Sequence, residues 1–199
     1  FLEAMPKTVE RIAVLDRTKE AGALGDPLYL DIKSVYYGQE NAPLVIGGRY
    51  GLSSKDTTPA QILAVYDNLA KGENAKDHFT IGINDDVTHL SLEVGPNIPV
   101  ASEDVSELIF FGLGSDGTVG ANKSTIKLIG DNTEYYAQAY FAYDSKKSGG
   151  VTRSHLRFGK SPIRSTYLVQ EAGFISCSLD TYVEKYDMLS SLKQNGTFL

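Results

Sequence analysis

The amino-acid sequence predicts an α/β protein made of two consecutive three-layer α/β/α units, residues 1–102 and 103–199, with mostly parallel or mixed sheets. Three observations support this prediction. Apolar runs typical of buried strands alternate with segments of helical periodicity. A chain of 199 residues suits one large domain or two small ones. A stretch between residues 93 and 106, with Gly, Pro and acidic residues but no periodicity, indicates a linker.

The first unit is predicted to alternate strands and helices. Three apolar segments indicate buried strands: residues 9–16, 43–48 and 79–83. Asp26-Pro27 and Thr58-Pro59 each place a capping residue before a Pro at the first helical position, which predicts two helix starts. Helical spacing predicts the core-facing side chains: Leu28, Ile32 and Val35 in the first helix, and Ile62, Leu63, Tyr66 and Leu69 in the second.

The second unit is predicted to begin with a strand at 108–111 that runs directly into a glycine loop. The elements expected after it are a helix at 119–129, a Tyr-rich strand at 137–143, a basic loop, strands at 166–169 and 174–177, and a helix at 182–193. Asn195-Gly196 then predicts a turn before a new strand, which would stop at its third residue. We therefore expect a piece of a longer polypeptide; the alternative is a frayed native tail.

Composition excludes several classes of function. The net charge of −6 argues against a general nucleic-acid or membrane-surface binder, and no apolar stretch approaches the ~20 residues that span a bilayer. A single cysteine, Cys177, cannot form an internal disulfide or hold an iron–sulfur cluster. The three histidines lack the spacing of a metal site, and no catalytic constellation is visible. We expect a cytoplasmic protein without a metal site or catalytic residues in this segment.

The glycine loop is the first candidate site. Residues 112–117 match G-x-G-x-x-G between a predicted strand and helix, where backbone N–H groups favour a phosphate. A dinucleotide-binding fold also needs an acidic residue about 20 residues later to bind the ribose. Asp144 is the candidate, but it lies 27 residues after Gly117, and two lysines follow it closely. A Walker A loop is excluded because Gly120 and Lys123 are not adjacent. A plain tight turn remains the alternative.

A basic segment is the second candidate site. Residues 145–170 carry six Lys or Arg residues and His155 but no acid. A positive segment in an acidic protein points to a local anionic ligand; the alternative is a basic edge that faces a partner surface. Both candidate sites lie at the ends of neighbouring predicted strands, so we favour one shared phosphate site.

Five segments together resemble the pyruvate:ferredoxin (flavodoxin) oxidoreductase family. In the second unit these are Gly112–Lys123, Tyr143–Thr152 and His155–Gly159, and in the first unit Ile12–Glu20 and Phe79–Thr88. The resemblance covers essentially the whole chain. It implies a transketolase-C-terminal-like domain at 1–102 followed by a gamma domain at 103–199, both partial.

The resemblance implies an enzyme that oxidatively decarboxylates pyruvate to acetyl-CoA, with thiamine diphosphate, [4Fe–4S] clusters and CoA as cofactors. Its partners would be the missing domains of the same chain and ferredoxin or flavodoxin, in a homodimer. This segment would supply CoA-phosphate contacts and interdomain scaffold. The candidate residues on the first loop and helix are Gly112, Gly114, Ser115, Gly117, Thr118, Asn122 and Lys123; those on the second loop are Asp144, Lys146, Lys147, Ser148 and Gly149.

Two other functions remain open from the residues alone. A free-standing Rossmann-type oxidoreductase could use NAD(P), with Lys146 and Lys147 contacting a 2′-phosphate. A structural interaction module could bury its basic loop against an acidic neighbour. An NADP-reducing fusion form of the resembled enzyme is also consistent with these residues.

Overall fold

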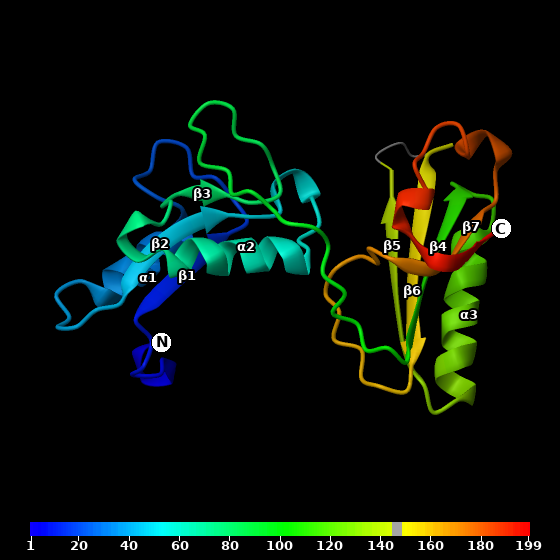
Figure 1. Cartoon of the computed structure of the whole chain (residues 1–199), viewed down its shortest axis with the longest axis horizontal. Coiled ribbons are helices and arrows are strands. Elements are labelled where there is room, and N and C mark those ends of the chain that lie inside the picture. The colour runs from blue at the N-terminus through cyan, green and yellow to red at the C-terminus, as the bar shows by residue number, and fades with distance from the viewer. Residues whose placement is uncertain (145–148) are drawn as a thin grey trace. The chain divides into compact units, whose positions relative to one another are not determined.

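The computed structural model describes residues 1–144 and 149–199 (Figure 1). The chain divides into two compact units, residues 1–98 and 99–199, and each is described by itself. The division falls inside the segment 93–106 that lacks periodicity. Within the described residues, no helix is both long and apolar enough to cross a membrane.

The first unit is built on a parallel three-stranded sheet of order β1-β2-β3 (Figure 1). The strands are β1 (Arg11–Asp16), β2 (Leu44–Arg49) and β3 (Phe79–Thr80). β3 is shorter than the predicted strand 79–83: pairing with β2 ends at Thr80, and Gly82 has a φ of 79°, which is not the extended backbone of a strand. Parallel strands require crossover connections, and the two helices of this unit supply them.

The helices α1 (Pro27–Tyr36) and α2 (Pro59–Ala70) cover opposite faces of this sheet. Val14 of β1 packs with α1, whereas its neighbours Ala13 and Leu15 pack with the core under α2, as the alternation of a strand requires. The unit is therefore a three-layer α/β/α sandwich. Thr58 and Gln61 form a capping box at the start of α2, which confirms the predicted helix start.

The start of α1 is capped differently from the prediction. Asp26 occupies the cap position, but its carboxylate pairs with Arg49 Nε at 2.7 Å. The carboxylate of Asp16, at the end of β1, instead accepts hydrogen bonds from the backbone N–H groups of Leu28 and Tyr29, both at 3.0 Å. The strand end thereby fixes the helix start through a contact that local sequence could not reveal.

The predicted core faces of both helices are partly wrong. Ile32 is buried as expected, but Leu28 is 48% exposed and Tyr29 takes its place in the core. In α2, Ile62, Leu63 and Tyr66 point outward, and the buried positions are Ala60, Ala64, Val65 and Asn68. Small side chains on the inner face let the helix lie close to the sheet, so the larger apolar residues remain outside.

The second unit holds a mixed five-stranded sheet of order β5-β6-β4-β7-β8. Its strands are β4 (Val105–Leu113), β5 (Tyr136–Tyr143), β6 (Val151–Gly159), β7 (Ala172–Cys177) and β8 (Leu192–Phe198). β6 pairs antiparallel with β4 and β5, whereas β7 pairs parallel with β4 and β8. The parallel and mixed sheets confirm the predicted α/β class.

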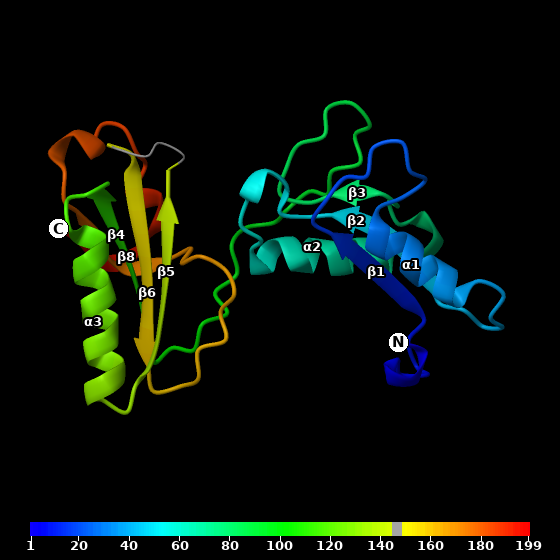
Figure 2. The same cartoon turned by 180° about the vertical axis from the view of Figure 1, so that it is seen from behind.

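Different elements pack on the two faces of this sheet. Helix α3 (Thr118–Asn132) runs along β4, β5 and β6 on one face, as seen from behind in Figure 2. On the other face, Ile109 and Phe111 of β4 pack with Val169, Tyr182 and Met188 from irregular segments. Among the described residues, α3 is the one α-helix of this unit.

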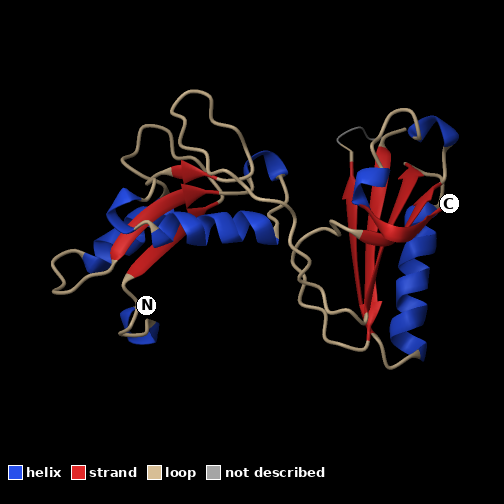
Figure 3. Ribbon diagram, viewed as in Figure 1, coloured by secondary structure: helices blue, strands red, loops and turns tan. Residues whose placement is uncertain are grey.

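Four predictions in the second unit are wrong (Figure 3). Residues 151–159, expected as loop, form the strand β6 between β4 and β5. Residues 166–169 form no strand, and residues 182–193 form no helix: short 3-10 turns at Asp180–Tyr182 and Leu189–Ser191 lead into β8. Asn195, expected in a turn, lies inside β8 with a left-handed φ of 64°.

Candidate functional site

The glycine loop joins β4 directly to α3, as the sequence predicts. Gly112 permits the close approach, because a Cβ there would lie 2.6 Å from Thr118 Cβ. Gly117 precedes the helix with a φ of 92°, which L-residues rarely adopt. The N–H of Gly114 donates to the carbonyl of Gly150 at 2.9 Å, so the end of the second candidate loop lies against the first. The structure thus brings the two candidate segments together.

Asp116 organises this loop. Its carboxylate accepts hydrogen bonds from the N–H groups of Leu113 and Thr118 and from the hydroxyl of Ser178, each at 2.8 Å. Desolvation opposes ionisation, but the hydrogen bonds from Thr118, Leu113 and Ser178 lower the pKa of Asp116 to about 2. A fixed negative charge therefore occupies the start of α3 and satisfies two donors that a phosphate could otherwise use.

Asp116 was not among the predicted site residues. The signal for it is the spacing Asp116-Gly117-Thr118, since an Asp side chain commonly accepts a hydrogen bond from the backbone two residues on. Its bond to Ser178, 62 positions later, has no such local signal. This contact ties the loop to the end of β7.

The other predicted residues lie in different environments. Asn122 is buried, with 4% of its surface exposed. Lys123 extends toward the sheet, and its Nζ lies 5.3 Å from the ring centroid of Phe141 in β5, a cation–π contact. Ser115 has a φ of 77°, and Asp144 follows the last residue of β5. Lys146, Lys147 and Ser148 lie outside the described residues; Gly149, which follows them, has a φ of 72°.

Part of the basic segment is a buried strand and not a ligand-binding loop. Arg153, His155 and Arg157 alternate along β6 and share the sheet face opposite α3. Arg157 is 2% exposed, so its charge must be balanced by protein groups. The acidic partner that the segment itself lacks comes from the neighbouring strand β4.

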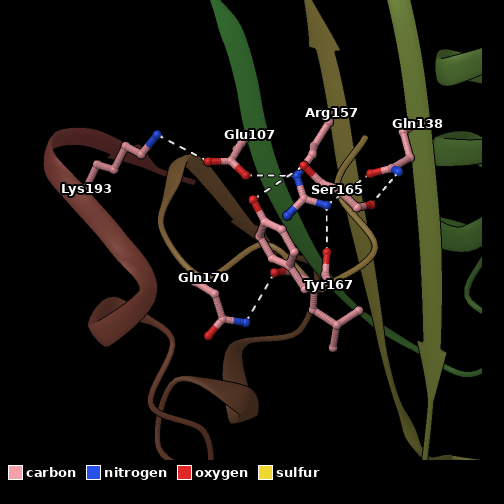
Figure 4. Close-up of polar contacts among 8 residues, drawn as sticks. Glu107, Gln138, Arg157, Ser165, Tyr167, Gln170 and Lys193 are labelled. Carbon is pink, nitrogen blue, oxygen red and sulfur yellow. Dashed lines mark hydrogen bonds and ion pairs between the residues drawn. The ribbon is translucent and has the colours of Figure 1, made fainter. Parts of the chain in front are cut away.

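Arg157 is the centre of a polar network between the sheet and the segment 160–171 (Figure 4). Its Nε donates to Glu107 Oε1 at 2.8 Å, and its Nη1 donates to Gln138 Oε1 at 3.0 Å and to the carbonyl of Tyr167 at 2.8 Å. The guanidinium carbon lies 4.9 Å from the Tyr167 ring centroid. Lys193 Nζ reaches the second Glu107 oxygen at 3.4 Å. Arg157 therefore holds the fold together and is not available to a ligand.

His155 lies between Arg153 and Arg157 on β6 and is 6% exposed. Neither of its ring nitrogens has a hydrogen-bond partner among the described residues. Burial, together with the positive charges of Arg157 and Arg153, lowers the pKa of His155 to about 4. The side chain is therefore neutral at pH 7. Arg153 itself lies over the rings of Phe111 and Tyr186, at 5.7 and 6.0 Å from their centroids.

The part of the chain that the structure describes offers no metal centre, since no three His, Cys, Asp or Glu side chains converge there. Cys177 is partly buried at the end of β7, and its thiol lies 3.1 Å from the carbonyl of Leu179.

Comparison with known proteins gives close relatives. A family model described as "Pyruvate ferredoxin/flavodoxin oxidoreductase" matches residues 107–199. The chain is 59% identical over 200 residues to a pyruvate-flavodoxin oxidoreductase of Enterobacter agglomerans, and 56% identical over 199 residues to a pyruvate:ferredoxin oxidoreductase of Moorella thermoacetica. Both alignments cover the whole chain and 17% of the relative.

Among solved structures, a pyruvate oxidoreductase subunit from Thermotoga maritima aligns over 48% of this chain and 49% of its own, with a TM-score of 0.39 and 16% identity. The chain spans about a sixth, 17%, of the length of each of these two curated relatives. The resemblance predicted from the motifs is confirmed: over its whole length, the chain is similar to one segment of the pyruvate:ferredoxin and pyruvate-flavodoxin oxidoreductases.

Proposed function

We propose that this chain is part of an enzyme that oxidatively decarboxylates pyruvate to acetyl-CoA and passes the electrons to ferredoxin or flavodoxin. The observation that carries the proposal is the 59% identity, over the whole chain, to an enzyme named pyruvate-flavodoxin oxidoreductase. The names of the relatives suggest both the substrate and the electron acceptor. A homodimer and a cytoplasmic location, which the resemblance implies, belong to the same proposal.

Within that enzyme, the chain would contribute CoA-phosphate contacts and interdomain scaffold. We assign residues 1–102 to a transketolase-C-terminal-like domain and residues 103–199 to a gamma domain. Two features support the phosphate contacts: a glycine loop that opens α3, and a lysine-bearing segment whose end at Gly150 bonds to Gly114. Both are features that an anion-binding loop requires.

The side chains of this segment fit some of the implied cofactors and not others. One cysteine and no convergent metal ligands among the described residues do not fit a [4Fe–4S] cluster, which needs four thiolates. The CoA phosphates fit better, because Lys123 follows the glycine loop on α3, and the sequence places Lys146 and Lys147 shortly before Gly150, whose carbonyl accepts the N–H of Gly114. CoA supplies the thiol that accepts the acetyl group. The residues of this chain would hold its phosphates and leave that thiol free to reach the reacting centre.

Asp116 limits how a phosphate could bind. Its carboxylate already accepts the N–H groups of Leu113 and Thr118 and adds a negative charge. A phosphate would therefore depend on the lysines and on backbone donors elsewhere in the loop. The lysine side chains are accordingly the decisive groups for a test.

The test uses the full-length enzyme with Lys123, Lys146 and Lys147 replaced singly by Ala. Loss of a charge-assisted phosphate contact should raise the KM for CoA roughly ten- to hundredfold and leave the KM for pyruvate unchanged. Lys127→Ala, on the same helix one turn beyond Lys123, is the matched control and should change neither constant. If none of the three variants raises the KM for CoA while pyruvate is still decarboxylated, the assignment of the phosphate contacts is wrong.

A further inference from the structure

The outer surface of α2 carries large apolar side chains that nothing in the first unit covers. Ile62 is 38% exposed, Leu63 is 49% exposed and Tyr66 is 65% exposed. Together with Ala70 they form what we call the α2 outer face. An amphipathic helix normally turns its larger apolar residues toward the core. Of the four residues whose periodicity predicted this helix, Leu69 packs against the core as a buried face requires, whereas Ile62, Leu63 and Tyr66 are exposed.

The rotation of α2 about its axis is fixed by its inner face. Asn68 is 1% exposed; its side-chain amide donates to the carbonyl of Lys76 at 2.9 Å and accepts from the N–H of Lys76 at 2.9 Å. Turning the helix to bury Leu63 and Tyr66 would break both hydrogen bonds. It would also remove Ala64 and Val65 from the core beside Phe79. The packing of the inner face of α2 therefore keeps the outer face exposed within this unit.

A groove borders this face. It has a volume of about 350 Å³ and is lined by Tyr66, Leu69 and Ala70 of α2 and by Thr8, Glu10 and Arg11. The Arg11 guanidinium donates to the carbonyls of Leu69 and Ala70, at 3.3 and 2.9 Å, and so fastens the start of β1 to the end of α2. These two hydrogen bonds hold one wall of the groove in place.

We propose that the α2 outer face and its groove are an interdomain docking surface, covered in the full-length oxidoreductase by an apolar surface of a domain outside residues 1–199. The proposal rests on the proposed function only in that this chain is part of that enzyme. Relatives match this chain over 17% of their length, so most of such an enzyme lies outside these residues. Exposed apolar patches of this kind mark interaction surfaces.

The size of the surface favours a tethered domain over a separate molecule. A helix of 12 residues is about 18 Å long and about 10 Å wide, which gives a face on the order of 180 Å². A stable complex between separate proteins buries about 800 Å² on each partner. A domain of the same polypeptide needs far less, because the linkage gives it a high effective concentration.

The experiment compares substitutions in the full-length enzyme and in the 199-residue chain. Leu63→Lys and Tyr66→Lys place a charge in the proposed interface, and Leu63→Met and Tyr66→Phe are the matched apolar controls. Leu, Met and Lys have similar helix propensities, so the Leu63 variants differ mainly in polarity. We expect both Lys variants to lower the thermal unfolding midpoint of the full-length enzyme, with the controls and all variants of the 199-residue chain unchanged.

Three results would overturn the proposal. An unchanged midpoint in the full-length Lys variants would mean that the face is open to solvent. An equal loss in the 199-residue chain would mean that these residues themselves cover it. Sedimentation of that chain as a dimer which Leu63→Lys dissociates would assign the face to a second copy. Failure of the proposed function is seen separately, as absence of acetyl-CoA formation by the unsubstituted enzyme.

Discussion

His155 is a histidine that the fold keeps uncharged. It lies on β6 between Arg153 and Arg157, and burial with these two charges lowers its pKa from 6.5 to about 4. Between these values the unfolded chain binds a proton that the folded chain does not. The free energy of unfolding should therefore be highest above pH 6.5 and fall as the pH drops toward 4, by at most about 3 kcal/mol.

The measurement is urea unfolding between pH 7.5 and pH 4, followed by a spectroscopic signal that reports on the second unit alone. His155→Leu removes the titrating group at similar size, so the slope of stability against pH over this range should become flatter. A variant with the same slope as the parent would show that other groups carry the pH dependence.

Asp116 should stabilise the turn from β4 into α3. Asp116→Ala removes the acceptor for the N–H groups of Leu113 and Thr118, which typically costs about 1 kcal/mol at a helix start. The folded-state pKa of about 2 lies below the ordinary value of 3.8, so this stabilisation is present above pH 4 and is lost as the pH falls toward 2.

Denaturant unfolding of Asp116→Ala and of the parent at pH 7 and near pH 2 tests this expectation. The difference in free energy of unfolding should vanish at the lower pH. Ser178→Ala is the control, because it removes one of the three hydrogen bonds to the carboxylate and leaves the helix start capped. A loss in Asp116→Ala that persists at low pH would indicate a steric cause.

At the scale of elements, Arg157 joins β6 to β4, β5 and the segment 160–171. Arg157→Met removes the buried partner of Glu107 and leaves only Lys193 Nζ, at 3.4 Å, beside this carboxylate, so the variant should lower the free energy of unfolding by up to about 3–5 kcal/mol. Arg157→Lys keeps the charge but lacks the fork that contacts Glu107, Gln138 and Tyr167 at once, and it should be only a partial substitute.

A double-mutant cycle measures the coupling. Because Glu107→Leu combined with Arg157→Met leaves no unpaired charge between these two positions, the double variant should lose less stability than the sum of the single variants. Limited proteolysis within residues 160–171 should accelerate in Arg157→Met, since this segment loses the bond to the Tyr167 carbonyl. Additive losses with unchanged proteolysis would contradict the role assigned to the network.

Elements with apolar periodicity could be predicted from the sequence, whereas β6 could not. The segments containing β1, β2, β4, β5 and β7 and the starts of the three helices follow local patterns of apolar residues, Pro and Gly. In β6, Arg153, His155 and Arg157 interrupt such a pattern, and the acid that balances Arg157 is Glu107, 50 positions earlier. A partner at that distance is fixed by strand pairing, so the basic segment was interpreted as a loop.

The candidate site, like the fold, was predictable where it depends on local sequence. The glycine loop between β4 and α3 follows from its motif, and Asp116 could have been found from the spacing to Thr118. The contact of Lys123 with Phe141 could not be predicted from the sequence, since it depends on how α3 lies across β5. Local chemistry therefore identifies the loop, and tertiary packing decides which of its side chains remain available to a ligand.

At the scale of the whole molecule, the chain alone should not oxidise pyruvate. Decarboxylation of a 2-oxo acid needs a cofactor that stabilises the carbanion, and electron transfer needs redox centres. The described residues include no cluster of metal ligands, and one cysteine cannot supply a [4Fe–4S] site. The similar enzymes are about six times longer, since the chain covers 17% of them.

The assay supplies the purified 199-residue chain with pyruvate, CoA, thiamine diphosphate and an electron acceptor, and the full-length enzyme serves as the positive control. We expect acetyl-CoA from the full-length enzyme and none from the chain. CoA should still raise the thermal midpoint of the chain if the lysine-bearing segment holds phosphates without the other domains. Acetyl-CoA formed by the chain would show that a complete catalytic centre resides in residues 1–199. Formation by neither protein would reject the proposed reaction itself.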